Sequence, residues 1–262
     1  MITTAMVMAA GHGTRMRALT NDRSKAMVEV GGRPLIDHML DRLAEAGVSR
    51  AVVNVHAHAD HLEAHLKARK SWPEIVISDE RDQLLETGGG VVKALPLLGN
   101  DPIFICNIDA VWIEHEHHKN FPVTDVNLGI DGMKVPLRKQ KSVLKQMRKW
   151  WNPDTMDDLL LLAPIEDTLG YYGKGDFNIG FDGHLTRRWQ DTAPYVYAGI
   201  QISTLEKFAN YPCEPFSRNK VWDDSLRTSR LYGYGMANFF WMHVGDPNAL
   251  EEAEQKLNQA NA

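Results

Sequence analysis

Short apolar runs alternate with segments of helical periodicity over the first hundred residues of the chain. The runs predict buried strands, and segments whose apolar residues recur every three or four positions predict amphipathic helices. Alternating strands and helices favour an α/β fold, with a parallel sheet covered on both faces and ligands at the carboxyl ends of its strands. Thr87 is placed to cap the helix that we expect at residues 86–98. We expect strands at residues 5–10, 51–55, 75–78 and 103–106, and helices at residues 35–47, 60–67 and 86–98.

The first apolar run ends at a loop that contains Gly11 and Gly13, and the cations Arg15 and Lys25 follow. Glycines let backbone amides approach a bulky anion, because no Cβ atom stands in the way. The loop and its cations are therefore equipped to hold a nucleoside triphosphate, although a tight turn with two surface cations would give the same pattern. A Walker loop would need Gly-Lys-Ser/Thr here, and a dinucleotide-binding turn would need a third glycine in place of Met16.

Three consecutive glycines, Gly88 to Gly90, follow Glu86-Thr87 at the start of a predicted helix. Glycines in a helix cost backbone entropy, so a close backbone contact is the expected reason for them. A flexible loop before the helix is the alternative.

Asp109 follows the apolar run at residues 103–106. A carboxylate at the end of a buried strand is well placed to hold Mg²⁺, which prefers oxygen ligands and bridges substrate phosphates. An aspartate that caps the following turn is the structural alternative. Because the glycine loop also follows a strand, we expect the loop and Asp109 to converge.

The glycine loop resembles the signature of the sugar-phosphate nucleotidyltransferases. Prolines usual in that family are replaced by Ala18, Ser24 and Ala26, which alters loop stiffness more than charge. The resemblance implies a Rossmann-like three-layer α/β sandwich with a mixed, mostly parallel central sheet. The matching signature positions are Ala9, Ala10, Gly11, Gly13, Thr14, Arg15, Met16, Leu19, Thr20 and Lys25.

The same resemblance implies roles for individual residues. Arg15 is expected to stabilise the departing pyrophosphate, and Lys25 the α-phosphate or the sugar phosphate. Residues 173–177 and 197–200 resemble sugar-facing segments, so Asp176 and Gly199 are expected to contact the sugar; a turn residue and a sheet bulge are the alternatives. The expected nucleotide contacts are Ala10, Gly11, Gly13, Thr14, Glu86, Gly88 and Gly89.

A second metal contact is expected near the C-terminus, where the family has an aspartate after a tryptophan. This chain has His243 at that place, two residues after Trp241. A neutral imidazole suits Mn²⁺, Co²⁺ or Zn²⁺ better than Mg²⁺. We therefore expect Mg²⁺ or another divalent cation such as Mn²⁺ on Asp109 and His243, with Asp246 as an alternative contact. A histidine with a purely structural role also fits.

We expect residues 1–262 to form a single nucleotidyltransferase domain. Residues 1–110 would be the nucleotide-binding half, 111–170 a variable basic insertion, and 171–262 the sugar-binding half with a C-terminal helix. Within the insertion, residues 133–151 predict a basic amphipathic helix that packs near the substrate mouth or at a subunit contact. Histidines gather at residues 56–65 and 115–118, and surface positions are a better interpretation than a zinc site because no known ligand spacing is complete.

Composition excludes several other classes of protein. The net charge of −5 gives no basic field to attract nucleic acid. Two cysteines without metal-binding neighbours suggest a reducing, cytoplasmic location. The chain lacks an apolar stretch long enough to span a membrane and a basic leader of the secretory type, so we expect no membrane partner. A monomer or a homodimer is expected.

These observations predict a metal-dependent enzyme that transfers a nucleoside monophosphate from a nucleoside triphosphate to a sugar 1-phosphate and releases pyrophosphate. The segment from Glu86 to Leu98 resembles the subgroup that uses UTP and N-acetylmuramate 1-phosphate. Mannose or glucose 1-phosphate with GTP or dTTP remains open. A nucleotide-sugar-binding regulatory protein with little catalysis is the alternative from another class, and a nucleic-acid-binding module is a distant third.

Overall fold

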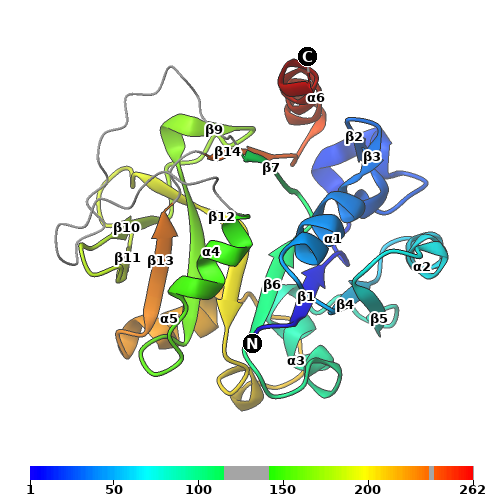
Figure 1. Cartoon of the computed structure of the whole chain (residues 1–262). Helices are drawn as coiled ribbons and strands as arrows, with labels where there is room; N and C mark the ends of the chain where they lie inside the picture. Colours follow the sequence, from blue (N-terminus) through cyan, green and yellow to red (C-terminus); the bar gives the residue numbers. More distant parts are fainter. Residues whose placement is uncertain (115–141, 236–238, 262) are drawn as a thin grey trace.

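The computed structural model of the protein describes residues 1–114, 142–235 and 239–261. Its centre is a nine-stranded mixed sheet, with helices on both faces (Figure 1). The strands of this sheet are β1 (Thr4–Met8), β4 (Arg50–Val55), β5 (Glu74–Asp79), β6 (Ile103–Asn107), β8 (Asp158–Pro164), β10 (Phe177–Ile179), β11 (Leu185–Arg187), β12 (Tyr195–Ser203) and β13 (Leu231–Gly235).

Two small sheets lie beside the large one, formed by β7, β14 and β9 and by β2 and β3. The bounds of these strands are β2 (Glu29–Val30), β3 (Arg33–Pro34), β7 (Ala110–Glu114), β9 (Thr168–Leu169) and β14 (Phe239–His243). The α-helices are α1 (Leu35–Glu45), α2 (Ala59–Ala68), α3 (Glu86–Leu98), α4 (Val143–Trp150), α5 (Asn219–Arg227) and α6 (Pro247–Asn261). Short 3-10 segments lie at Thr14–Thr20, Lys25–Met27, Ile165–Asp167 and Phe208–Asn210.

The central strands β6, β1, β4 and β5 are parallel neighbours, and β12 joins β6 in the antiparallel direction. The prediction of a mixed sheet with parallel central strands is therefore confirmed. Each predicted strand and helix of the first hundred residues is present, with ends shifted by a residue or two. The predicted halves share one sheet because β12 pairs with β6, whereas the assignment of nucleotide and sugar to them stays a prediction.

The three layers follow from the alternation of side chains along the central strands. Val7, Val53 and Cys106 face one side and pack in one core with the apolar stripes of α1, α2 and α4. Met6 and Ile105 face the other side, where they pack against α3 and the start of α5. Because both faces of the sheet are buried, its free edge for a ligand is the edge at the strand ends.

The basic segment is described only from residue 142 onwards. Helix α4 buries Val143, Leu144 and Met147, and the guanidinium of Arg148 lies 5.6 Å from the ring centre of Phe104 on the sheet. The amphipathic helix is therefore present over Val143–Trp150 and packs on its own domain. The basic residues at positions 134, 138, 139 and 141 and the histidines at 115, 117 and 118 lie outside the described residues.

None of the described helices is both long and apolar enough to cross a membrane.

Candidate functional site

The glycine loop begins where β1 ends. The amides of Ala9 and Ala10 donate to Asn54 Oδ1 at 2.6 and 3.2 Å, so the Ala10 amide is already bonded within the protein. Gly11 is exposed, and a Cβ atom added there would have no neighbour within 4 Å. The loop therefore presents open backbone at Gly11, where a ligand can approach.

Gly13 holds the turn that brings the loop to Lys25. Its φ is +65°, in the left-handed region, and an added Cβ would lie 2.8 Å from Lys25 Cβ. Thr20 Oγ1 donates to the Gly13 carbonyl at 3.1 Å, and Ser24 accepts a hydrogen bond from the amide of Ala26. Only glycine fits at this turn without displacing Lys25.

Lys25 lies against Asp109, as the convergence of the strand ends predicted. Lys25 Nζ donates to Asp109 Oδ2 at 2.8 Å, and His243 Nε2 lies 3.3 Å from the same oxygen. Burial alone would raise the pKa of Asp109, but the charge of Lys25 and the hydrogen bonds from His243 and Lys25 hold that pKa well below its usual range. The neighbouring Lys25 and His243 therefore favour the ionised form of Asp109.

The chemistry of this pair fits a divalent cation. His243 Nδ1 lies 3.3 Å from the Gly170 carbonyl; if it donates there, a neutral imidazole turns its Nε2 lone pair toward Asp109. A lone pair that faces a carboxylate is unfavourable, and either a proton or a metal ion at Nε2 would remove this repulsion. A backbone carbonyl on the other ring nitrogen is the usual support for a histidine that binds a metal. No group of three His, Cys, Asp or Glu side chains suited to a metal occurs in the part of the chain that the structure describes. Substrate phosphates and water would have to complete the coordination.

Asp246 has another role. Its Oδ1 accepts a hydrogen bond from the amide of Ala249 at 3.0 Å, which caps the start of α6. The hydrogen bond from Val244 N to the Asp109 carbonyl, at 2.9 Å, holds the end of β14 beside Asp109. His243, on that strand, is therefore the residue that the fold brings to Asp109.

A buried polar pair connects the loop to the start of α3. Glu80, which is fully buried, accepts from Asn54 Nδ2 at 2.7 Å and from the amide of Leu85 at 3.1 Å. Asn54 in turn holds the amides at the end of β1. Neither residue was predicted from the sequence, although Asn54 is a polar residue in an apolar run and Glu80 directly follows a strand, and both are signals that could have identified them.

The glycines of α3 pack against the chain itself. An added Cβ at Gly88 would lie 2.2 Å from the ring of Phe216, and one at Gly89 would lie 2.1 Å from the carbonyl oxygen of Glu214. The Gly88 amide donates to the Phe216 carbonyl at 2.8 Å. The close backbone contact that we expected is present, but its described partner is a loop of this protein.

The N-cap prediction for Thr87 is wrong. Helix α3 begins at Glu86, whose φ is +57°, and no side chain caps it. Thr87 Oγ1 instead accepts a hydrogen bond from the amide of Arg218 at 3.0 Å. The hydroxyl thus connects α3 to the start of α5.

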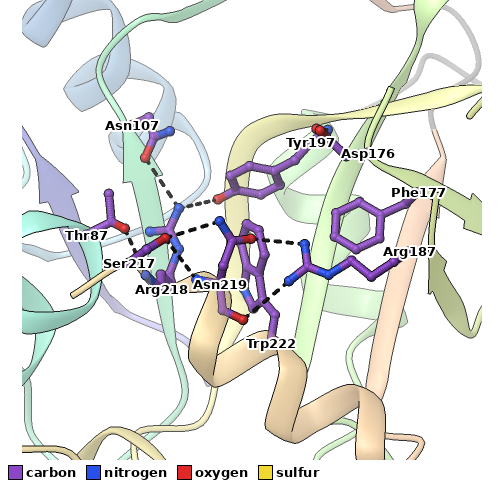
Figure 2. Close-up of a pocket in the computed structure, with 10 residues that line it drawn as sticks. All are labelled: Thr87, Asn107, Asp176, Phe177, Arg187, Tyr197, Ser217, Arg218, Asn219 and Trp222. Carbon is purple, nitrogen blue, oxygen red and sulfur yellow. Dashed lines mark hydrogen bonds between the residues drawn. The ribbon is translucent and has the colours of Figure 1, made fainter. Parts of the chain in front are cut away.

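A cavity of about 290 Å³ opens between α3, α5 and the ends of β6, β10, β11 and β12 (Figure 2). Two of the expected sugar-side features belong to this region. Asp176 lines the cavity and accepts from the amide of Tyr197 at 2.9 Å. Gly199, with φ +83°, lies at a bulge of β12 and packs beside Asn107 and Ala110. The residues that line the cavity are Thr87, Asn107, Asp176, Phe177, Arg187, Tyr197, Ser217, Arg218, Asn219 and Trp222.

The expected site residues thus lie in two neighbouring groups. Lys25, Asp109 and His243 are in contact, and Asn107, two residues before Asp109, lines the cavity. Arg15 is exposed and forms no ion pair among the residues the structure covers. Arg218 and Trp222 were missed because no motif or spacing marks them.

Several known proteins resemble this chain in sequence or in fold. Residues 5–121 match the model of the MobA-like NTP transferase domain. The chain is 45% identical to an N-acetylmuramate alpha-1-phosphate uridylyltransferase of Caulobacter vibrioides, over 98% of this chain and 97% of that protein. It is 31% identical to a mannose-1-phosphate guanylyltransferase catalytic subunit beta of Drosophila melanogaster, over 94% of this chain and 60% of that protein. The structure of a UDP-glucose pyrophosphorylase with UDP-glucose superposes with a TM-score of 0.73 at 16% identity, over 99% of this chain and 100% of that one.

Proposed function

Because the chain belongs to the sugar-phosphate nucleotidyltransferases, we propose that it is the member of that family that transfers uridylate from UTP to N-acetylmuramate 1-phosphate. Transfer of a nucleotide to a sugar 1-phosphate is common to its relatives. The choice of UTP and of the amino sugar rests on the 45% identity over nearly the whole chain to the Caulobacter enzyme.

The contact between Lys25, Asp109 and His243 is the structural observation that supports the chemistry. In this reaction a phosphate oxygen of the sugar 1-phosphate attacks the α-phosphorus of the triphosphate. A new phosphorus–oxygen bond forms, and the bond to the departing pyrophosphate breaks. Such a transfer depends on positioning and charge neutralisation rather than on a covalent nucleophile.

We assign the residues as follows. Lys25 neutralises the α-phosphate or the sugar phosphate, Arg15 the pyrophosphate, and the open amide at Gly11 faces the triphosphate. Asp109 and His243 would hold a divalent cation, Mg²⁺ or Mn²⁺, which when bound screens the negative charge of the phosphates. Asp176 and Gly199 are assigned to the sugar, and Glu86, Gly88 and Gly89 border the nucleoside.

A matrix assay tests the proposal. The purified protein is given each of four nucleoside triphosphates with each of several sugar 1-phosphates, and pyrophosphate release is measured with Mg²⁺, with Mn²⁺ and with a chelator. We expect the highest kcat/KM for UTP with N-acetylmuramate 1-phosphate, and loss of turnover with the chelator. Preference for GTP with mannose 1-phosphate, or dTTP with glucose 1-phosphate, would replace this assignment. Binding without turnover for every pair would favour the regulatory alternative.

Variants of the loop cations sharpen the test. Arg15→Ala should lower turnover by orders of magnitude, because this exposed cation has no partner among the described residues and is assigned to the leaving group. Arg23→Ala is the matched control, since Arg23 is an exposed arginine of the same loop that pairs with Asp22. Equal activity of the two variants would remove Arg15 from the mechanism.

A further inference from the structure

Arg218 is a buried cation that pairs with no carboxylate of the described residues. It stands at the start of α5, lines the cavity and is 3% exposed. Within the part of the chain that the structure describes, its Nε and Nη1 atoms have no hydrogen-bond partner, and it forms no ion pair. Arg187, in the same cavity, differs because its guanidinium pairs with Asp223 at 2.7 Å.

The guanidinium is nevertheless held in one place (Figure 2). It lies 5.4 Å from the ring centre of Tyr197 and 5.3 Å from that of Trp222. Its Nη2 donates to Tyr197 Oη at 3.0 Å, and Tyr197 donates to Gln201 at 3.2 Å. The remaining contact of Nη2, to Asn107 Oδ1, is 3.5 Å long and is weak enough to be exchanged for a ligand.

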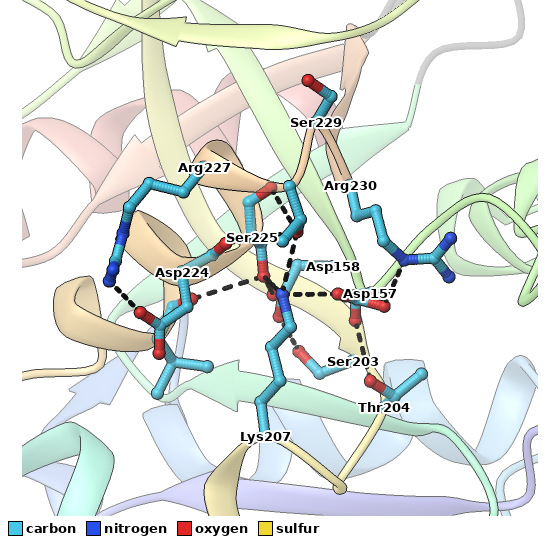
Figure 3. A network of polar contacts seen from close by, with 12 residues as sticks. Asp157, Asp158, Ser203, Thr204, Lys207, Asp224, Ser225, Arg227, Ser229 and Arg230 are labelled. Carbon is cyan, nitrogen blue, oxygen red and sulfur yellow. Dashed lines mark hydrogen bonds and ion pairs between the residues drawn. The ribbon is translucent and has the colours of Figure 1, made fainter.

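The chain of hydrogen bonds continues into the core. Gln201 Nε2 donates to the buried Asp158 at 3.1 Å, and Asp158 also accepts from Ser203 and Ser225 (Figure 3). Burial raises the pKa of Asp158. The carboxylate of Asp158 is thus committed to three other donors, and Arg218 keeps its charge for the cavity.

A buried charge without a partner is unfavourable, so the position of Arg218 points to an anion that enters with the substrate. Lys25 and Arg15 are assigned to the phosphates, and neither of them lines the cavity. Arg218 instead stands among Tyr197, Trp222 and Asn107, where the body of the sugar would lie.

We propose that Arg218 binds a carboxylate carried by the sugar ring, and that this contact sets the preference of the enzyme for its sugar. The inference rests on the proposed function. N-acetylmuramate differs from N-acetylglucosamine by a lactyl ether that ends in a carboxylate, so the two 1-phosphates form a matched pair of substrates. A guanidinium on a carboxylate is among the stronger polar contacts in proteins.

The test compares kcat/KM for the two 1-phosphates in the wild type and in Arg218→Gln. We expect Arg218→Gln to lose roughly 100-fold with N-acetylmuramate 1-phosphate and less than about 3-fold with N-acetylglucosamine 1-phosphate. Arg218→Lys, which keeps the charge but not the planar fork, should retain part of the preference. Arg227→Gln, an exposed position of the same helix, is the control.

Equal losses with both substrates would overturn the inference, because Arg218 would then serve the phosphate or the shared part of the sugar. A measurement on the wild type does not depend on how the variants fold: the methyl ester of N-acetylmuramate 1-phosphate should react like the N-acetylglucosamine compound, and unchanged kcat/KM with the ester also refutes the contact. Failure of the proposed function would look different, since the wild type would then not use N-acetylmuramate 1-phosphate at all.

Discussion

The turn at Gly13 makes a sharp prediction, because two glycines of the loop, Gly11 and Gly13, should respond differently to the same substitution. Gly13 combines φ +65° with a Cβ position 2.8 Å from Lys25 Cβ. Gly11 has neither a left-handed backbone nor a neighbour within 4 Å of an added Cβ. Gly13→Ala and Gly11→Ala therefore separate the folding of the loop from its contact with the nucleotide.

The magnitude for Gly13→Ala has two parts. A residue with a Cβ in the left-handed region costs about 1 kcal/mol. Relief of the overlap with Lys25 must move one of two backbone-anchored atoms, which costs about 1–3 kcal/mol. The free energy of unfolding should therefore fall by roughly 2–4 kcal/mol. Gly11→Ala should change it by less than about 0.5 kcal/mol.

Urea unfolding followed by tryptophan fluorescence measures both variants. With an m-value of about 3 kcal/mol/M, the midpoint of Gly13→Ala should fall by roughly 1 M. Turnover should fall with it, because Lys25 is displaced from Asp109. Gly11→Ala should unfold like the wild type but show a raised KM for the nucleoside triphosphate, since a methyl group then occupies the open backbone. A Gly13→Ala protein of wild-type stability would refute the loop conformation, and an unchanged KM in Gly11→Ala would refute its contact with the triphosphate.

Three further predictions concern neighbouring contacts. Lys25→Met should lower turnover by orders of magnitude and stability at pH 7 by about 2–3 kcal/mol, because it leaves Asp109 without its cation. Since the pKa of Asp109 is depressed in the folded protein, the stability difference should be full at neutral pH, begin to shrink as pH falls below about 4, and continue to shrink toward the lower pKa of the folded state. Urea midpoints that show an undiminished difference at about pH 3 would contradict this. Glu80→Gln should cost about 1–3 kcal/mol, because one of its two buried acceptor oxygens is replaced by a donor, and wild-type urea unfolding would count against the Asn54–Glu80–Leu85 connection. Gly88→Ala should destabilise the protein through the ring of Phe216, and Phe216→Leu in the same chain should restore part of the loss; a double-mutant cycle that finds the two effects additive would rule out the contact.

The alternation of apolar runs with segments of helical periodicity was sufficient to predict the first half of the fold. Strand β4 is an apolar run, as expected for a strand buried on both faces, and α1 has an apolar stripe of helical period. The rule that the carboxyl ends of parallel strands lie at one edge predicted that the glycine loop before Lys25 would converge with Asp109. The sequence was less informative where a residue is required by a contact with a distant part of the chain. Gly88 and Gly89 pack against Phe216 and Glu214, more than a hundred residues away, so their pattern predicted a close backbone contact without identifying its partner.

Arg218 is a second residue whose role depends on distant parts of the chain and could not be predicted from the sequence. A single arginine before a short helix has no spacing that separates it from a surface cation. Only the fold, which brings β12 and α5 around it, reveals that it is buried and unpaired. The second half of the sheet is likewise antiparallel in part, and its short strands β10 and β11 carry too few residues for a periodic signal.

The register of the small sheet gives position 243 an unusual freedom. Because His243 pairs with Ala110 across β14 and β7, the side chain at this position points at Asp109 whatever its chemistry, while its neighbours Met242 and Val244 are fully buried and hold the strand in place. If His243 holds the cation as we propose, exchanging the imidazole for a carboxylate should alter which ion is favoured without rebuilding any element around it. A single substitution at this position would then be enough for the metal preference of such an enzyme to change during evolution.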